Sequence, residues 1–141
     1  MSVFTSSPYS LSYGTLVVAR GSATNNYGTS TSSSPNTFGA TVETQPLQMT
    51  APYMMSRWNT SIMIGWNSET GSNTGGSSIL NYTLYSDQGS GGVSYVIVYQ
   101  GLNTDFNVTG LTPNTQYGFI IQATNIYGSS PNSTVALIYT L

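Results

Sequence analysis

Alternation of apolar with other residues is the main pattern along this chain, and it is clearest over residues 115–124. A period of two predicts a β-strand with one apolar face. Pro113, just upstream, fixes its own φ and predicts a corner. Asn125 and Gly128 tolerate left-handed backbone geometry and predict a turn at the other end. The apolar positions of the strand are Tyr117, Phe119, Ile121 and Ala123.

Similar short stretches, separated by runs of Gly, Ser, Asn and Pro, recur from residue 45 to the end of the chain. The strands that we predict are residues 47–51, 60–66, 79–85, 93–99, 104–108, 115–124 and 133–139. No segment has helical periodicity. Seven short strands at intervals of roughly 8–12 residues predict an all-β fold with two packed sheets.

Large side chains at inward positions of these strands and corners are expected to form one core between the two sheets. They are Trp66, Tyr82, Leu111, Tyr117 and Phe119. Tyr117 begins its strand directly after the corner at Pro113. This position is typical of a tyrosine corner, in which the ring packs inside and the hydroxyl bonds the backbone a few residues upstream.

These motifs resemble those of a fibronectin type III domain. Residues 110–128 resemble its E–F corner and strand F, residues 61–66 its strand B with a core Trp, and residues 79–85 its strand C with a core Tyr. Residues 128–140 are similar to the F–G loop and strand G. The resemblance covers about residues 45–141 and implies an immunoglobulin-like, seven-stranded β-sandwich. It implies little about function, because this module serves many proteins as a spacer or a binding surface.

The beginning of the chain resembles part of a second copy. Residues 24–30 repeat residues 124–130 at an offset of 100 positions, which suits a repeat of about 100 residues. We therefore expect residues 1–44 to hold strands E, F and G of a partial module, and residues 45–141 to form a complete domain. Strand G of the partial module is expected near residues 39–43.

Charged residues are scarce. They make up 4% of the chain and give a formal net charge of −2, against about 25% charged residues in an ordinary domain. So few basic groups cannot neutralise a nucleic-acid backbone or form a polybasic membrane patch. No apolar run approaches the roughly 18 residues of a membrane span. We therefore expect neither nucleic-acid binding nor membrane insertion.

Residues that could carry catalysis are nearly absent. His and Cys each number zero, and both basic residues are Arg, so the common acid–base groups, Schiff-base lysines and thiol nucleophiles are missing. Glu69 and Asp87 fall in loops at opposite ends of a predicted strand, which argues against a glycosidase pair. The sequence predicts no enzyme, no catalytic, cofactor-binding or metal site, and no cofactor.

Four Asn-x-Ser/Thr sequons are candidate N-glycosylation sites: Asn59, Asn81, Asn107 and Asn132. Chance gives about this many sequons in a chain so rich in Ser and Thr, so their number alone decides nothing. Asn81 and Asn107 each neighbour an inward residue and are expected to face solvent. Several Tyr and Trp residues outside the predicted core either pair across strands or contact a protein or a sugar.

A partial module has open strand edges, which are templates for pairing with another chain. The hypothesis is an extracellular or cell-surface structural or adhesion module from a tandem array, acting as a filament or fibre subunit. Its partners would be further copies or neighbouring repeats, or a carbohydrate. Leu16, Val17 and Val18 would make the contact between subunits. The alternatives are a spacer or carbohydrate-binding accessory module of a secreted carbohydrate-active enzyme, and a virion fibre or decoration module.

Overall fold

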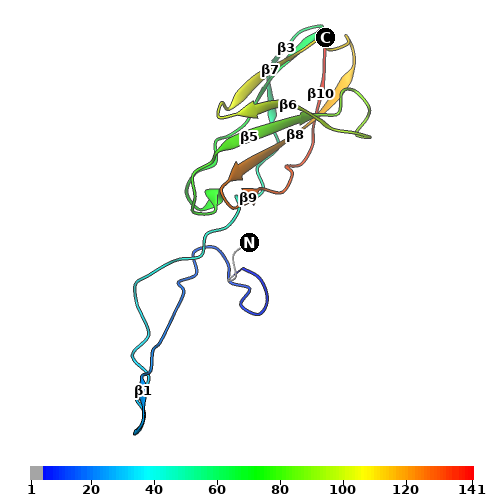
Figure 1. Ribbon diagram of the computed structural model, residues 1–141. Helices are drawn as coiled ribbons and strands as arrows, with labels where there is room; N and C mark the ends of the chain where they lie inside the picture. Colours follow the sequence, from blue (N-terminus) through cyan, green and yellow to red (C-terminus); the bar gives the residue numbers. More distant parts are fainter. Residues whose placement is uncertain (1–4) are drawn as a thin grey trace. The chain divides into compact units, whose positions relative to one another are not determined.

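The computed structural model describes residues 5–141 (Figure 1). Contacts divide the chain into two compact units, residues 1–43 and residues 44–141. We call the first the N-terminal unit and the second the domain. Each has its own internal contacts, and each is considered by itself.

The domain consists of two antiparallel sheets. The first sheet contains β3 (Tyr53–Arg57), β4 (Ser61–Gly65) and β7 (Asp105–Thr109) in that order. The second has the order β10 (Ala136–Tyr139), β8 (Gln116–Asn125), β5 (Asn81–Ser86) and β6 (Val96–Gly101), with β9 (Gly128–Ser129) also paired to β8. A short 3-10 helix, η1 (Gly71–Thr74), lies in the long polar loop. The predicted immunoglobulin-like β-sandwich is confirmed.

The first strand of the domain lies later than the sequence predicts. We expect a strand at residues 47–51, whereas β3 begins at Tyr53. Pro46 and Pro52 are the reason, because a proline has no amide to give to a sheet ladder. Met49, between them, is 3% exposed and still contributes its side chain to the core. This segment therefore packs as a strand would, without pairing as one.

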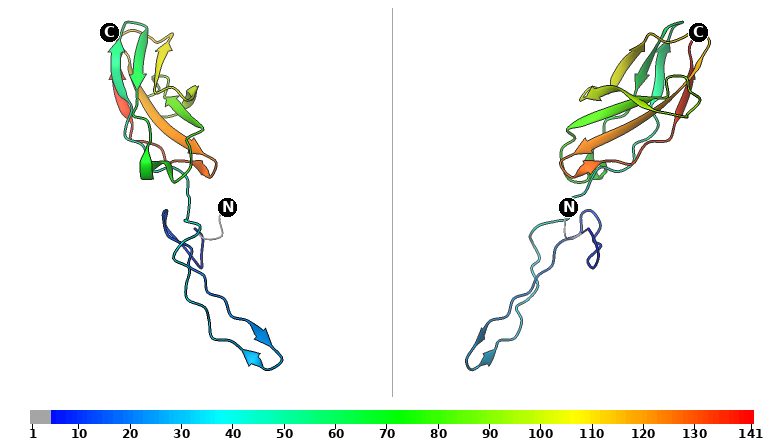
Figure 2. Two further views of the ribbon diagram at one scale, coloured as in Figure 1. Left: turned by 90° about the vertical axis from the view of Figure 1, so that its left-hand side faces the viewer. Right: turned by 45° about the vertical axis from the view of Figure 1, so that its right-hand side comes forward.

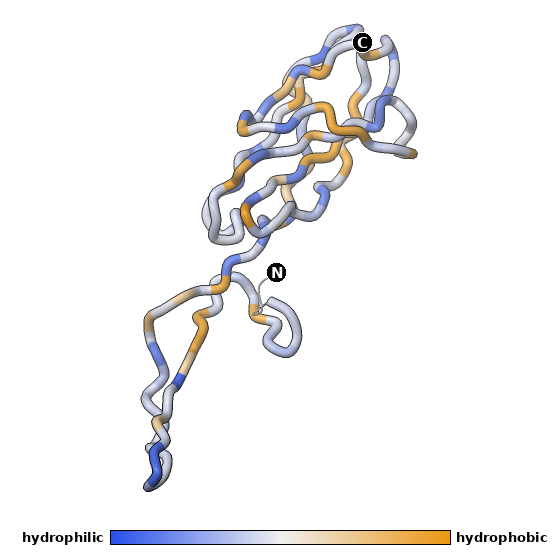
Figure 3. The backbone as a smooth tube through the Cα atoms, viewed as in Figure 1, coloured by the Kyte–Doolittle hydropathy of each residue, from blue (hydrophilic) through white to orange (hydrophobic). Residues whose placement is uncertain are grey.

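All five side chains expected in the core are buried there: Trp66, Tyr82, Leu111, Tyr117 and Phe119. The Trp66 ring lies 6.2 Å from that of Tyr82 and 5.7 Å from that of Tyr99, measured between centroids. Tyr99 was not expected in the core, but its ring also packs 4.9 Å from Phe106. The aromatic cluster thus joins the two sheets across the sandwich. In Figure 3 the apolar positions, in orange, alternate with more polar ones along the strands of the domain.

The corner before β8 is tied by hydrogen bonds from side chains to the backbone. The Tyr117 hydroxyl accepts a hydrogen bond from the amide of Thr112 at 2.9 Å, which is the tyrosine corner predicted above. Thr140 Oγ1 donates to the carbonyl of Thr112 at 2.7 Å and accepts from the amide of Thr115 at 3.0 Å. Strand β10 and the corner are therefore fixed to each other.

Asp87 is a structural carboxylate rather than a catalytic candidate. It is 1% exposed, and its oxygens accept from the amides of Gly118 at 2.8 Å, Gly89 at 2.9 Å and Gly92 at 3.0 Å. Gly118 has no Cβ, and an added one would come within 2.9 Å of the Tyr95 hydroxyl and 3.1 Å of Asp87. Burial, and then the charge of Asp87, raise the pKa of Tyr95.

The N-terminal unit is an extended hairpin (Figure 2). Its regular part is β1 (Thr24–Asn25) paired with β2 (Gly28–Thr29). Backbone bonds continue the pairing beyond this tip, from the amide of Val17 to the carbonyl of Ala40 at 3.0 Å, for example. Leu16 and Thr41 form an isolated bridge.

The hairpin has the connectivity of a strand F, a turn and a strand G. The strand E expected in the partial module would lie around Val3, outside the described residues. Residues 39–43, expected as strand G, contribute Thr41 to the bridge and the carbonyl of Ala40 to the pairing. The assignment of the N-terminal unit as part of a second module stays a prediction.

Replacing Trp66 tests the core. Trp66→Ala is expected to lower the free energy of unfolding of the domain by about 3–5 kcal/mol through lost burial and a new cavity. Trp66 Nε1 has no hydrogen-bond partner in the described residues, so Trp66→Phe should cost clearly less than Trp66→Ala. Urea unfolding of the two variants measures both values. Equal losses would contradict a core dominated by ring packing.

Asp87→Ala is expected to lower the free energy of unfolding by roughly 2–5 kcal/mol, because it leaves the buried amide of Gly118 and the two loop amides without their acceptor. Asp87→Asn keeps one acceptor oxygen and removes the charge, so it should cost less and lower the pKa of Tyr95. Above about pH 10 the folded state disfavours ionised Tyr95, so wild-type stability should fall there. Ultraviolet titration and urea unfolding test this. An unchanged Tyr95 titration in Asp87→Asn would contradict the assigned interaction.

Candidate functional site

The turn at the tip of the N-terminal hairpin repeats a turn of the domain in atomic detail. Asn25 Oδ1 accepts from the amide of Tyr27 at 2.9 Å, and Asn125 Oδ1 accepts from the amide of Tyr127 at 2.8 Å. The following glycines have φ values of 141° and 139°, which a side chain rarely allows. An Asn side chain that accepts a hydrogen bond from the amide two residues later stabilises such a turn locally.

The bonds across the two turns correspond as well. Thr24 and Thr29 join their hydroxyls at 2.9 Å, and the equivalent Thr124 and Ser129 do so at 2.8 Å. One step further out, the amide of Ala23 donates to Ser30 Oγ at 3.0 Å, and that of Ala123 donates to Ser130 Oγ at 3.1 Å. The repeat seen in the sequence is thus a repeat of hydrogen bonds.

In the domain, the turn at residues 123–130 binds residues 44–47, which we call the leading segment. Asn125 Nδ2 donates to the carbonyls of Thr44 and Thr74, both at 2.8 Å. The amide of Thr44 donates to the carbonyl of Gly75 at 2.8 Å. Gln45 lies over Gly128, with its Oε1 3.4 Å from where a Cβ would stand. Asn125 is 3% exposed as a result.

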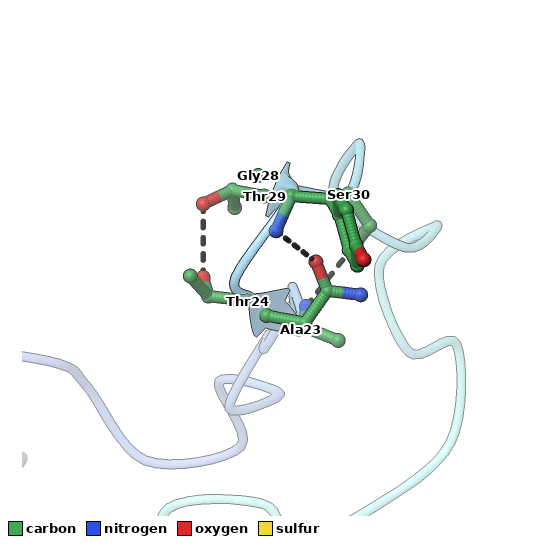
Figure 4. A pocket seen from close by; sticks show the side chains of 7 residues that line it. Ala23, Thr24, Gly28, Thr29 and Ser30 are labelled. Carbon is green, nitrogen blue, oxygen red and sulfur yellow. Dashed lines mark hydrogen bonds between the residues drawn. The ribbon is translucent and has the colours of Figure 1, made fainter.

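In the N-terminal unit, the equivalent turn is open. Residues 23–25 and 27–30 line a cavity of about 390 Å³ at the hairpin tip (Figure 4). Tyr27 is 99% exposed, against 44% for Tyr127 in the domain. Asn25 Nδ2 makes no hydrogen bond with any described residue. We call this turn, residues 23–30, the tip site. Figure 3 shows it as hydrophilic.

One edge of the hairpin is a second exposed feature. The amides of Val17 and Ala19 bond across the hairpin, to the carbonyl of Ala40 and to Asn36 Oδ1. The alternate amides, at Leu16 and Val18, make no hydrogen bond within the described residues. Val18 is also 61% exposed, while Leu16 and Val17 are half-buried. We call residues 15–22 the open edge.

The four sequons differ in exposure. Asn59, Asn107 and Asn132 are exposed. The sequence predicts a solvent-facing Asn81, but this residue is half-buried on β5, where its Oδ1 accepts from Thr83 Oγ1 at 3.3 Å. All four stay predicted glycosylation sites.

The sequence predicts neither the role of Asn125 nor the open tip site. Residues 24–30 and 124–130 stand out in it only as a repeat and as turn formers. The bonds from Asn125 to Thr44 and Thr74 span 81 and 51 positions of sequence, and no local pattern predicts such pairs.

Residues 5–141 contain neither a metal-binding cluster nor a membrane-spanning helix. Among residues 5–141, no group of three His, Cys, Asp or Glu side chains could hold a metal ion. The same residues include no helix that is long and apolar enough to cross a membrane.

Comparison with known proteins identifies the domain. Residues 44–138 match the family model of the fibronectin type III domain. The chain is 33% identical over 90 residues to mouse fibronectin type III domain containing protein 3C1, which covers 64% of this chain and 6% of that protein. It is 30% identical over 100 residues to human fibronectin type-III domain-containing protein 3A, covering 71% of this chain and 8% of the relative.

Solved structures agree. The sixth fibronectin type III domain of human fibronectin type III domain containing protein 3 has 26% sequence identity and a TM-score of 0.60, and the match covers 74% of this chain and 92% of that one. The twitchin kinase region from C. elegans has 25% identity and a TM-score of 0.58, covering 67% of this chain and 16% of that one. This chain therefore spans less than a tenth of the curated relatives that it matches.

Asn125→Ala tests the hydrogen bonds that hold the leading segment. It removes bonds to two backbone carbonyls in a nearly buried place, so we expect the free energy of unfolding of the domain to fall by about 1–3 kcal/mol. Gly75→Ala should destabilise it too, because an added Cβ would stand 2.1 Å from the carbonyl oxygen of Thr44. Hydrogen exchange should show the amides of Thr44 and Leu47 deprotected in both variants. Asn103→Ala, at an exposed residue of another loop, controls for general loosening. Unchanged exchange at Thr44 in Asn125→Ala would show that Asn125 does not hold the leading segment.

Proposed function

The chain belongs to the fibronectin type III domain family, and on this premise we propose that it is a non-catalytic structural or adhesion module that assembles through the open edge of its N-terminal unit. Fibronectin type III domains are found in tandem arrays of extracellular and muscle proteins, and they commonly mediate contacts between proteins. The relatives are fibronectin type III domain-containing proteins, and such modules are generally non-catalytic. The finer role proposed here is that of a filament or surface-fibre subunit, outside the cell or on its surface.

The observation that carries the proposal is a strand that is hydrogen-bonded to other described residues on one side only. In the domain, β8 pairs with β10 on one edge and with β5 on the other. Within residues 5–141, the strand that occupies the corresponding place in the hairpin, residues 15–23, pairs only with the strand that returns from the tip. An unpaired edge with an exposed apolar residue, here Val18, is a template for another strand. A strand of the β5 type is the natural occupant.

Strand addition of this kind gives affinity through main-chain hydrogen bonds and specificity through alternate side chains. If each copy offers an edge at one place and accepts one at another, the contact is head to tail and generates an open filament rather than a closed dimer. The low charge of the chain, 4% charged residues, leaves little repulsion between copies to oppose it.

Sedimentation of residues 1–141 and 44–141 tests the proposal. We expect the full chain to associate and residues 44–141 to stay monomeric. Val18→Pro removes an amide that faces the open edge without removing a bond of the hairpin, so it should abolish association. Val18→Thr keeps the amide and the branched shape, and should associate as the wild type does. A monomeric full chain, or equal association of Val18→Pro and Val18→Thr, would overturn the proposal.

A further inference from the structure

The two turns described above have the same internal bonds, but only the turn of the domain is covered by another segment of the chain. In the domain, backbone carbonyls of the leading segment and its neighbouring loop lie against Asn125 Nδ2, and the side chain of Gln45 covers Gly128. The tip site has the same Asn and the same Gly. Its residues are all exposed, they line an open surface cavity of about 390 Å³, and Tyr27 is uncovered.

We propose that the tip site binds an extended stretch of polypeptide in the way that the domain's turn binds its own leading segment. Asn25 Nδ2 donates to a backbone carbonyl of this ligand, as Asn125 does to Thr44. A long side chain of the ligand lies over Gly28, as Gln45 lies over Gly128. Tyr27 then packs against the ligand with its ring while its hydroxyl stays in solvent, a placement that suits Tyr at interfaces.

The chemistry of the tip site selects the class of ligand. Residues 23–30 carry no charge, so the site offers no ion pair to a phosphate or to a charged peptide. Its Asn25 amide matches a peptide carbonyl, and Oδ1 of Asn25 is already used by the amide of Tyr27. The side chain is therefore held in place before a ligand arrives, which lowers the entropy lost on binding. A neutral, extended segment with a Thr-Gln-Pro sequence, such as residues 44–46, is the expected ligand.

This inference concerns a different surface from the open edge, and the two separate in experiment. The edge uses main-chain amides at residues 15–22. The tip site uses a side chain at the turn. Asn25→Ala should therefore leave sedimentation of the full chain unchanged, and Val18→Pro should leave binding at the tip site unchanged.

The test is an NMR titration of the isotope-labelled full chain with a synthetic peptide of residues 44–50, which carries no charged side chain, blocked at both ends. We expect dose-dependent shifts of the amides of residues 23–30 and of the Asn25 side-chain NH₂ signals, with a dissociation constant on the order of 1 mM for so few contacts. The signals of residues 123–130 should stay in place, because that turn is filled by its own leading segment. Asn25→Ala should weaken binding at least tenfold. Asn26→Ala, at a neighbouring side chain that does not line the cavity, should not.

A second measurement detects binding that is too weak for the titration. The same peptide, joined to the N-terminus of the full chain through a flexible Gly/Ser linker, reaches an effective concentration in the millimolar range and should protect the Asn25 side chain from solvent exchange. A tethered peptide of scrambled sequence is the control. Absence of shifts at 10 mM free peptide together with absence of protection by the tethered one overturns the inference. So does equal binding by Asn25→Ala and the wild type, or by the scrambled peptide.

Discussion

The structure depends on one requirement, that a long central strand has its backbone groups bonded on both edges. β8 meets it by pairing with β10 and β5, and the core side chains Tyr117, Phe119 and Ile121 project from it between the sheets. A buried amide without an acceptor costs more than a hydrogen bond gains. The order of the strands in the second sheet, with β8 between β10 and β5, meets this requirement.

With few charges and no Cys, the domain is fixed by bonds between side chains and the backbone. The Tyr117 hydroxyl, Thr140 Oγ1, the Asp87 carboxylate and the Asn125 amide each join segments far apart in the sequence. Each is placed where a strand ends and the regular ladder no longer supplies partners. Polar side chains thus do at the ends of the sandwich what the ladders do in its middle.

The sequence predicted what depends on local pattern. Alternation located β4, β5, β6, β7, β8 and β10, and Pro113 before Tyr117 located the corner, whereas the two-residue β9 lies in what was predicted to be a loop. It misplaced β3, because burial of Met49 gives a strand-like pattern where Pro46 and Pro52 prevent pairing. It missed the structural role of Asp87 and the grip of Asn125 for a different reason. Their partners depend on how loops meet after folding, which alternation does not encode.

The hairpin shows why its two proposed contacts are separable. At equal distance from the turn, Ala19 and Gly21 stand where β8 has Phe119 and Ile121. The strand therefore has little apolar surface of its own to bury, and its pairing depends on what a partner strand supplies. The turn from Ala23 to Ser30 needs no such help, because its bonds close within eight residues. The order of the tip site does not depend on pairing at the open edge. It can therefore bind a ligand whether or not that edge is occupied.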